Sequence, residues 1–107
     1  MDIKRDKRII SEIVSKYIEL LRKNRIGFHD IYLFGSYVKG SYNSDSDIDL
    51  AIVLNKNKID RFDERLKLMK LRWNVDLRIE PHPFSIKDFD KTDPFVKEII
   101  ATGEKIV

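Results

Sequence analysis

The sequence predicts a small α/β (α+β) protein in which a mixed β-sheet is flanked by helices. Apolar residues recur at three- and four-residue steps between residues 6 and 24, which is typical of an amphipathic helix. Short apolar runs at residues 31–34 and 50–54 have the length of buried strands. Helix and strand patterns continue to alternate toward the C-terminus, which favours a sheet covered by helices.

The N-terminal half is expected to contain one helix and two strands. The helix near residues 6–24 would bury Ile10, Ile13, Val14, Tyr17, Ile18, Leu20 and Leu21. Gly27 breaks this pattern, and a strand follows at residues 31–34. The next strand begins at Asp47 and runs to about Leu54, so a polar turn joins the two strands.

The next two elements are a helix and a strand. Asp60 can cap the helix through its side chain. The predicted buried stripe of this helix consists of Phe62, Leu66, Met69 and Trp73. Residues 75–80 alternate between apolar and charged side chains, as a strand does. Pro81 and Pro83 are expected to end this strand, because proline cannot donate a hydrogen bond to a ladder.

The last helix is expected to follow Asp93, an N-cap residue with Pro94 at the first helical position. Gly103 would terminate this helix, and residues 106–107 would add a short final strand. A chain of 107 residues points to a single domain, residues 1–107.

Composition narrows the class of protein. The net charge is +3, from 21 basic and 18 acidic residues, and the sequence has no basic stripe with interleaved aromatics, so direct nucleic-acid binding is not expected. Cysteine is absent, which excludes disulfides and thiolate metal sites and fits a reducing cytoplasm. No apolar run approaches the roughly 18 residues of a membrane-spanning helix, and the N-terminus lacks a signal-peptide segment. We therefore expect a cytoplasmic protein that does not contact membranes.

The motif that carries chemistry is Gly35-Ser36, followed after ten residues by Asp47-Ile48-Asp49. Side chains two apart on a strand point to the same side, so Asp47 and Asp49 share a face while Ile48 points into the core. Two adjacent like charges repel unless a cation lies between them, and Mg²⁺ is bound by one or two carboxylates together with substrate phosphates. A Gly-Ser turn can hold phosphate oxygens through backbone amides and a hydroxyl. The motif therefore predicts a site for a metal-bound nucleoside triphosphate.

The acidic residues have two other interpretations. One is a solvated acidic turn before a strand, which is common for polar clusters of this kind. The other is a calcium loop, since Asp45, Asp47 and Asp49 have the required alternation. The calcium loop is excluded because Leu50 replaces its glycine and Lys56 replaces its bidentate glutamate.

A P-loop is also excluded. Gly35 and Gly40 have its glycine spacing, but Ser41-Tyr42 stands where Lys-Ser or Lys-Thr is required. The sequence contains no G-x-G-x-x-G motif either, so a dinucleotide-binding fold has no support. Lys39 lies between the Gly-Ser turn and the Asp pair, and it is either a surface lysine or a residue that reaches the triphosphate.

A third carboxylate comes from the strand predicted at residues 75–80. Asp76, Arg78 and Glu80 lie on its polar face, and Asp76 comes at its beginning. If this strand neighbours the Asp47 strand, Asp76 completes a triad of carboxylates; otherwise Asp76 faces solvent on an edge strand. His29 and His82 lie far apart and lack metal-ligand spacing, so neither is expected to have a chemical role.

Together these residues resemble the signature of the minimal nucleotidyltransferases of the DNA polymerase β superfamily: Gly35, Ser36, Asp47, Asp49 and Asp76. The resemblance implies the polymerase β-like nucleotidyltransferase fold and the transfer of AMP from ATP to a hydroxyl. It implies two Mg²⁺ ions, about 3.5–4 Å apart, with Asp47 and Asp49 bridging both and Asp76 holding the one that activates the acceptor. Gly35 and Ser36 would bind the β- and γ-phosphates. One departure is Val-Lys-Gly at residues 38–40, where many relatives have Ala-Arg-Gly and the charge is the same.

The resemblance also implies a partner. Larger relatives carry an additional domain that grips the acceptor, and 107 residues are expected to leave no room for one. The acceptor would then be presented by another protein, by a second copy of this chain, or by a small molecule. Similar short proteins are antitoxins that adenylylate a tyrosine of a helical HEPN-type ribonuclease toxin, and this is the expected function. The alternatives are an antitoxin that acts only by contact and a nucleic-acid-binding module with a vestigial site; three intact carboxylates disfavour both.

Overall fold

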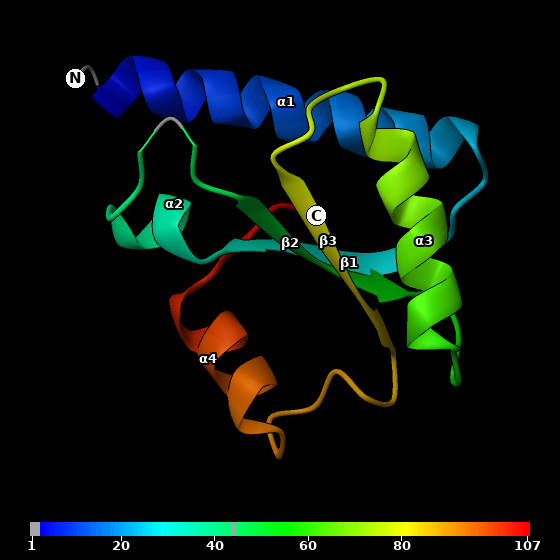
Figure 1. The fold of residues 1–107 in the computed structure, drawn as a ribbon. Coiled ribbons are helices and arrows are strands. Elements are labelled where there is room, and N and C mark those ends of the chain that lie inside the picture. The colour runs from blue at the N-terminus through cyan, green and yellow to red at the C-terminus, as the bar shows by residue number, and fades with distance from the viewer. Residues whose placement is uncertain (1–2, 44) are drawn as a thin grey trace.

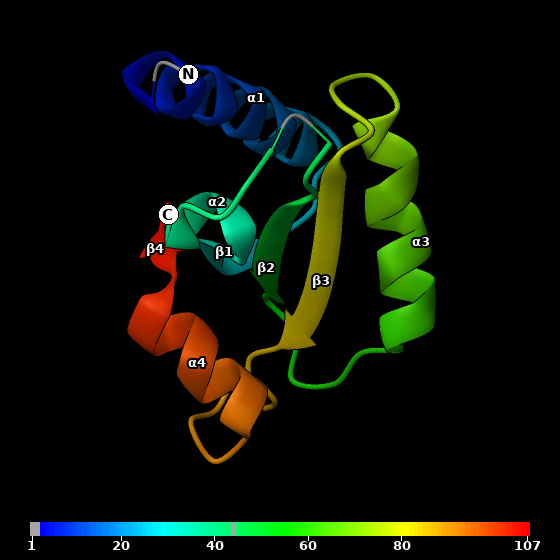
Figure 2. The ribbon, with the colours of Figure 1, turned by 60° about the vertical axis from the view of Figure 1, so that its left-hand side comes forward.

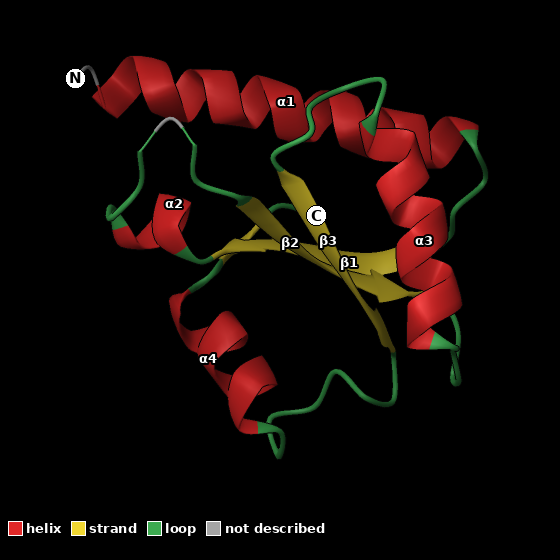
Figure 3. Cartoon of the chain, viewed as in Figure 1, coloured by secondary structure: helices red, strands yellow, loops and turns green. Residues whose placement is uncertain are grey.

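The computed structural model describes residues 3–43 and 45–107, and it confirms the mixed α/β architecture (Figure 1 and Figure 3). The elements in chain order are α1 (Ile3–Lys23), β1 (Phe28–Phe34), α2 (Ser36–Lys39), β2 (Ile48–Leu54), α3 (Arg61–Arg72), β3 (Ile79–Ser85), α4 (Pro94–Thr102) and β4 (Glu104–Lys105). The strand order in the sheet is β3-β2-β1-β4. β1 is antiparallel to both β2 and β4, whereas β2 and β3 are parallel, so the sheet is mixed.

Helices cover both faces of the sheet (Figure 1). On one face, the larger core lies between the sheet and the helices α1 and α3. β2 contributes its alternate residues Ile48, Leu50, Ile52 and Leu54 to this core, since every second side chain of a strand points to the same face. Tyr17 of α1 donates a hydrogen bond of 2.7 Å to the carbonyl of Leu68 in α3, which ties the two helices together. On the opposite face, a smaller cluster forms between the sheet and α4 and contains Ala51, Phe84, Val96 and Ile99.

The predicted buried stripe of α3 is wrong. Phe62 and Trp73 are 71% and 72% exposed, and Leu66 is 44% exposed. The face that α3 turns toward the core instead carries Leu68, which is buried, and Leu71, which is partly buried. Both sets of residues have helical spacing, so periodicity did not distinguish the inner face of this helix from the outer one.

The strand predicted at residues 75–80 is also wrong, since β3 covers Ile79–Ser85 and includes both prolines. β3 lies at the edge of the sheet and pairs only with β2 among the described strands. Ile48 donates a hydrogen bond to the carbonyl of Arg78, so the even-numbered residues of β3 face β2. Pro81 and Pro83 therefore turn their nitrogens toward the free edge, where no donor is needed.

The remaining elements are close to the expectations. α1 and β2 have nearly the predicted bounds, and the Asp60 side chain caps α3 by accepting a hydrogen bond from the Asp63 amide. Asp93 caps α4 in the same way through the amide of Phe95. The final strand forms at Glu104–Lys105, slightly before the predicted position. Among the described helices, none combines the length and apolarity that crossing a membrane requires.

Candidate active site

The two halves of the sequence motif meet at the end of β1. The antiparallel register pairs Phe34 with Asp49, which places Gly35 directly beside the start of β2. Gly35 has φ +83° and ψ −150°, a conformation that is essentially restricted to glycine. A Cβ atom at this position would also collide with Asp49 Oδ2. Backbone conformation and close packing against the carboxylate therefore both require glycine here.

Asp47 and Asp49 flank a fully buried residue, Ile48, which points into the core beneath α1 and α3. The alternation of the strand directs Asp49, the next residue of β2, to the opposite side of the sheet. Asp47 lies immediately before β2 and is exposed, whereas Asp49 is half-buried. Their carboxylates supply hard oxygen atoms, which are the ligands that Mg²⁺ prefers.

His82 is a site residue that the sequence analysis missed. Its Nε2 atom lies 3.2 Å from Asp49 Oδ1, within hydrogen-bonding distance. The imidazole packs against the rings of Phe34 and Phe95, with ring centroids 5.1 Å and 6.4 Å away. No spacing in the sequence connects His82 with Asp49; the contact arises from the parallel register, which pairs Ala51 with His82.

Asp76 does not begin a strand. It lies in the turn between α3 and β3, and its carboxylate accepts hydrogen bonds from the Arg78 amide (2.8 Å), Nε (3.1 Å) and Nη2 (2.9 Å). These side-chain hydrogen bonds hold the pKa of Asp76 below its ordinary value. Arg78 Nη1 also donates to the Tyr37 hydroxyl at 3.3 Å, so the Asp76–Arg78 pair is linked to α2.

The predicted triad is not assembled in this structure. Within residues 3–43 and 45–107, no group of three or more Asp, Glu, His or Cys side chains is arranged to hold a metal ion. The acidic residue that the sheet places opposite Asp49 is Glu80 of β3. Its carboxylate pairs instead with Arg65 and Arg72 of α3, each at 3.0 Å.

The residues assigned to phosphate binding lie at α2. Ser36 is the first residue of this short helix, and Lys39 is the last. Lys39 Nζ pairs with Glu98 of α4 at 3.1 Å, and both side chains are largely exposed. Exposed pairs of this kind contribute little to stability, so the ammonium group is readily available to another anion.

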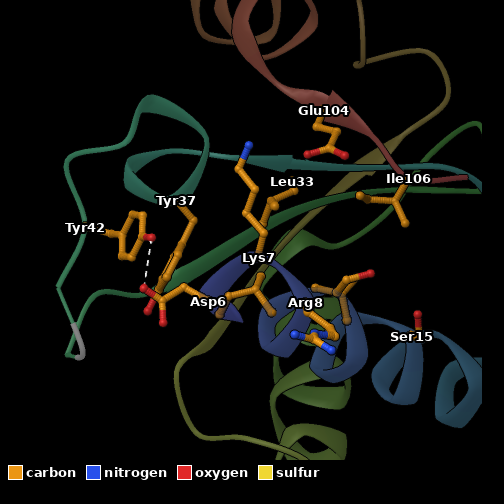
Figure 4. Close-up of a pocket in the computed structure, with 12 residues that line it drawn as sticks. Asp6, Lys7, Arg8, Ser15, Leu33, Tyr37, Tyr42, Glu104 and Ile106 are labelled. Atoms are coloured by element: carbon orange, nitrogen blue, oxygen red, sulfur yellow. Dashed lines mark hydrogen bonds between the residues drawn. The ribbon is translucent and has the colours of Figure 1, made fainter. Parts of the chain in front are cut away.

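A cavity of about 340 Å³ lies behind α2, between α1 and the edge of the sheet formed by β1 and β4 (Figure 4). Tyr42 and Tyr37 stack with a centroid separation of 4.6 Å at one side, and the Tyr42 hydroxyl donates to Asp6 Oδ2 at 3.2 Å. None of the three predicted catalytic carboxylates lines this cavity. The candidate active site is therefore the end of β2 beside Gly35, and none of its predicted catalytic carboxylates belongs to this cavity.

The chain is similar to other proteins in sequence and in structure. Over 61 residues it is 36% identical to "Putative protein adenylyltransferase MJ1379" of Methanocaldococcus jannaschii, covering 57% of this chain and 60% of that relative's length. Its structure is similar to a chain in the crystal structure of a mutant of the toxin–antitoxin MntA-HpeT, with a TM-score of 0.60 and 26% identity over 87% of this chain and 70% of the other. A chain in a toxin–antitoxin structure with AMP-PNP gives a TM-score of 0.59 and 25% identity, over 87% of this chain and 71% of the other.

The family model described as "Polymerase beta, Nucleotidyltransferase" matches residues 15–107, which is most of the chain. The chain therefore belongs to the polymerase beta nucleotidyltransferase family.

Proposed function

We propose that this nucleotidyltransferase moves AMP from Mg²⁺-bound ATP to a hydroxyl group of a partner protein. The observation that carries the proposal is the contact between the Gly35 turn and the Asp49 carboxylate. A turn that can hold phosphates and a carboxylate that can hold a cation are in contact, as a metal–triphosphate complex requires.

Each residue of the motif has a role in this proposal. Asp47 and Asp49 would hold Mg²⁺, two ions in the complete complex, which would neutralise the attacking and leaving oxygens during in-line displacement. Gly35 and Ser36 would bind the phosphates that leave as pyrophosphate, and Lys39 would exchange Glu98 for the triphosphate. The acceptor hydroxyl oxygen bonds to the α-phosphorus as the bond from that phosphorus to the bridging oxygen breaks, and the hydroxyl proton passes to a carboxylate.

The third carboxylate has two candidates. Asp76 has the position in the sequence motif, but it would have to exchange Arg78 for a metal ion. Glu80 has the position in the sheet, opposite Asp49, but it would have to leave Arg65 and Arg72. We assign the role to Asp76 and use Glu80 as the matched comparison in the predictions below.

The acceptor in this proposal is a protein. The name of the Methanocaldococcus relative specifies a protein adenylyltransferase, and both similar structures are toxin–antitoxin proteins. We infer that the chain is an antitoxin that adenylylates a tyrosine of a helical HEPN-type ribonuclease toxin. An added phosphate brings negative charge and strong acceptor oxygens, which would repel RNA phosphates from the ribonuclease site.

The test uses a HEPN-type helical ribonuclease as the proposed partner. We expect that incubation with this chain, ATP and Mg²⁺ adds the mass of AMP to the ribonuclease and that inhibition persists after the two proteins are separated. Asp47→Asn is the control, and it should leave the mass of the ribonuclease unchanged. If Asp47→Asn inhibits the ribonuclease as well as the wild type does at equal concentration, contact rather than transfer is the mechanism.

A further inference from the structure

The Asp49 carboxylate lies between two different neighbours. Its Oδ2 atom lies against the Gly35 turn, where it is the atom that a Cβ at position 35 would meet at the shortest distance. Its Oδ1 atom lies 3.2 Å from Nε2 of His82. The side chains of Asp49 and His82 are only 24% and 23% exposed. The two oxygens of one carboxylate therefore have separate environments, one facing the turn and the other facing the imidazole.

The hydrogen bond between these two side chains has one direction. An ionised carboxylate only accepts hydrogen bonds, so Nε2 of His82 carries the proton and donates it to Oδ1 of Asp49. A hydrogen bond to a charged acceptor is about twice as strong as one between neutral groups. The contact therefore favours the orientation of Asp49 that turns Oδ2 toward Gly35.

The imidazole of His82 is itself held by aromatic rings. The ring of Phe34, in β1, lies with its centroid 5.1 Å away, and the ring of Phe95, in α4, lies at 6.4 Å. Both rings are inclined to the imidazole, by 59° and 69°, and such tilted or edge-on arrangements are favourable for aromatic pairs. α4 covers the face of the sheet opposite to α1 (Figure 2). Two rings from different elements on this face therefore restrict the rotation of the imidazole.

The backbone that carries His82 is also constrained. Pro81 and Pro83 stand on either side of it in β3. A proline fixes its own φ, and the residue before a proline is restricted to extended conformations. β3 pairs with β2 in a register that sets Ala51 opposite His82, so this stiffened segment has a defined position relative to Asp49. The place of the Nε2 atom is therefore set by the backbone as well as by the packing of the ring.

A carboxylate held in this way suits the binding of a cation. A metal ligand binds best when its oxygen is already directed at the ion, and hydrogen bonds to the ligating group provide this orientation. In the proposed function the phosphates lie at the Gly35 turn, and Oδ2 of Asp49 is the oxygen that faces this turn. The His82 nitrogen is a less suitable ligand, because Mg²⁺ prefers oxygen.

We propose that His82 is a positioning residue that holds the Asp49 carboxylate with Oδ2 directed toward the Gly35 turn, where a divalent cation would bind. His82 acts through Asp49 and not on the reacting atoms. The cation rests on the proposed function. The orientation of the carboxylate does not, because it follows from contacts within the protein alone.

Two substitutions of His82 separate its hydrogen bond from its packing. His82→Gln keeps an N–H donor at the same number of bonds from the backbone as Nε2. His82→Met has a similar length and fills the space between the rings, but its thioether cannot donate a hydrogen bond. The control is His29→Met, because His29 makes a comparable contact of 2.9 Å with Asp30 at the end of β1 far from Gly35.

The first measurement, urea unfolding, needs neither ATP nor a metal ion. Gly35→Ala places a methyl group against Oδ2 of Asp49, so its effect depends on whether the carboxylate can turn away. His82→Met releases the carboxylate, and the effect of Gly35→Ala on the unfolding equilibrium constant should shrink at least about threefold in this background. In the His82→Gln and His29→Met backgrounds the effect should match that in the wild type within about twofold. An effect that is equal in all backgrounds, or that shrinks equally with Gln and Met, would overturn the proposal.

The second measurement adds the cation, and it uses the single variants in case a double variant does not fold. Calorimetry with ATP gives the Mg²⁺ concentration at which ATP binding is half-maximal. This concentration should rise at least about tenfold in His82→Met, because the ligand is no longer held in place. It should stay within about threefold of the wild-type value in His82→Gln and His29→Met. An unchanged Mg²⁺ requirement in His82→Met, or an equal rise in His82→Gln, would show that His82 only fills space and would overturn its positioning role.

The two measurements separate this inference from the proposed function. If His82→Met relieves Gly35→Ala but ATP binding by the wild type does not depend on Mg²⁺, the orientation of Asp49 stands and the proposed metal site fails. If the wild type transfers AMP with Mg²⁺ but neither measurement distinguishes His82→Met from His82→Gln, the proposed function stands and the positioning role of His82 fails.

Discussion

Replacing Gly35 with alanine tests the contact on which the active site depends. At φ +83° and ψ −150°, a residue with a Cβ atom carries a strain of about 1–3 kcal/mol. The new methyl group would also collide with Asp49 Oδ2, and overpacking of this kind costs about 1–3 kcal/mol more. We therefore expect Gly35→Ala to lower the free energy of unfolding by about 3 kcal/mol or more.

Gly40→Ala is a control that separates strain from collision. Gly40 also has a positive φ, +80°, but a Cβ atom there would meet no atom within 4 Å. Only the left-handed conformation is penalised, at about 1–2 kcal/mol. Urea unfolding followed by circular dichroism should therefore show a clearly larger loss for Gly35→Ala than for Gly40→Ala.

A double-mutant cycle then identifies the atom responsible. Asp49→Ala removes the carboxylate and keeps the Cβ atom of residue 49, which lies at the ordinary contact distance of 3.6 Å from the methyl group that Gly35→Ala introduces. The Gly35→Ala penalty should shrink by about 1–2 kcal/mol in this background. If the two substitutions are additive, Gly35 and Asp49 do not touch and the geometry of the site is wrong.

Three further predictions concern the carboxylates. Asp47→Asn and Asp49→Asn should each retain the fold but reduce AMP transfer about a thousandfold, a loss of about 4 kcal/mol of transition-state stabilisation. Calorimetry of the wild type should show ATP binding that depends on Mg²⁺. Normal transfer by either variant would contradict the metal-site assignment. Asp76→Asn should abolish AMP transfer while ATP affinity stays within about threefold, because the proposed role of Asp76 is to hold the metal ion that activates the acceptor hydroxyl. If transfer survives in Asp76→Asn and disappears in Glu80→Gln, the role belongs to Glu80. The hydrogen bonds from Arg78 hold the pKa of Asp76 below its ordinary value. This ionised pair therefore stabilises the fold at a pH above the ordinary carboxyl pKa of about 4, and the stabilisation is lost as the pH falls through the lowered pKa of the folded state. Thermal melts should accordingly show that the free energy of unfolding of the wild type exceeds that of Asp76→Asn by about 1 kcal/mol at neutral pH, and that this difference disappears in strong acid. A difference that does not change with pH would contradict the ion-pair explanation.

The first part of the site could be predicted because it is local in the sequence. Gly35 follows one strand, Asp49 begins the next, and two consecutive antiparallel strands bring those ends together. The burial of Ile48 in β2 then places Asp49 on the opposite face of the sheet, and the place of Asp47 on that same face stays a prediction. Neither conclusion depends on how distant segments pair.

The position of the third carboxylate depends on such a pairing and was not predictable. Residues 75–80 have the alternation of a strand, but the Asp76 side chain binds the backbone amide two residues later, which favours a turn. The strand begins only at Ile79 and continues through two prolines. A sequence does not reveal whether a proline-containing segment lies at an edge, where its missing donors have no cost.

The outer face of α3 was mispredicted for a related reason. Phe62, Leu66, Met69 and Trp73 are the larger apolar set, and hydrophobicity would favour burying them. The inner face instead carries Leu68, Leu71 and the buried carboxylate of Glu64, which Lys56 neutralises at 2.7 Å. Periodicity identifies both faces as regular, and only the tertiary fold decides between them.

The two mispredictions lie side by side in the molecule. α3 packs against β3, and a groove beside Phe62 is lined on the strand side by His82 and Pro83. β3 contributes buried Ile79 to the larger core and buried Phe84 to the smaller one, although it is an edge strand with two prolines. Burial in the core and protection of the edge are therefore compatible in this strand, because Pro81 and Pro83 turn their nitrogens outward and leave a further strand without two of the donors it would need.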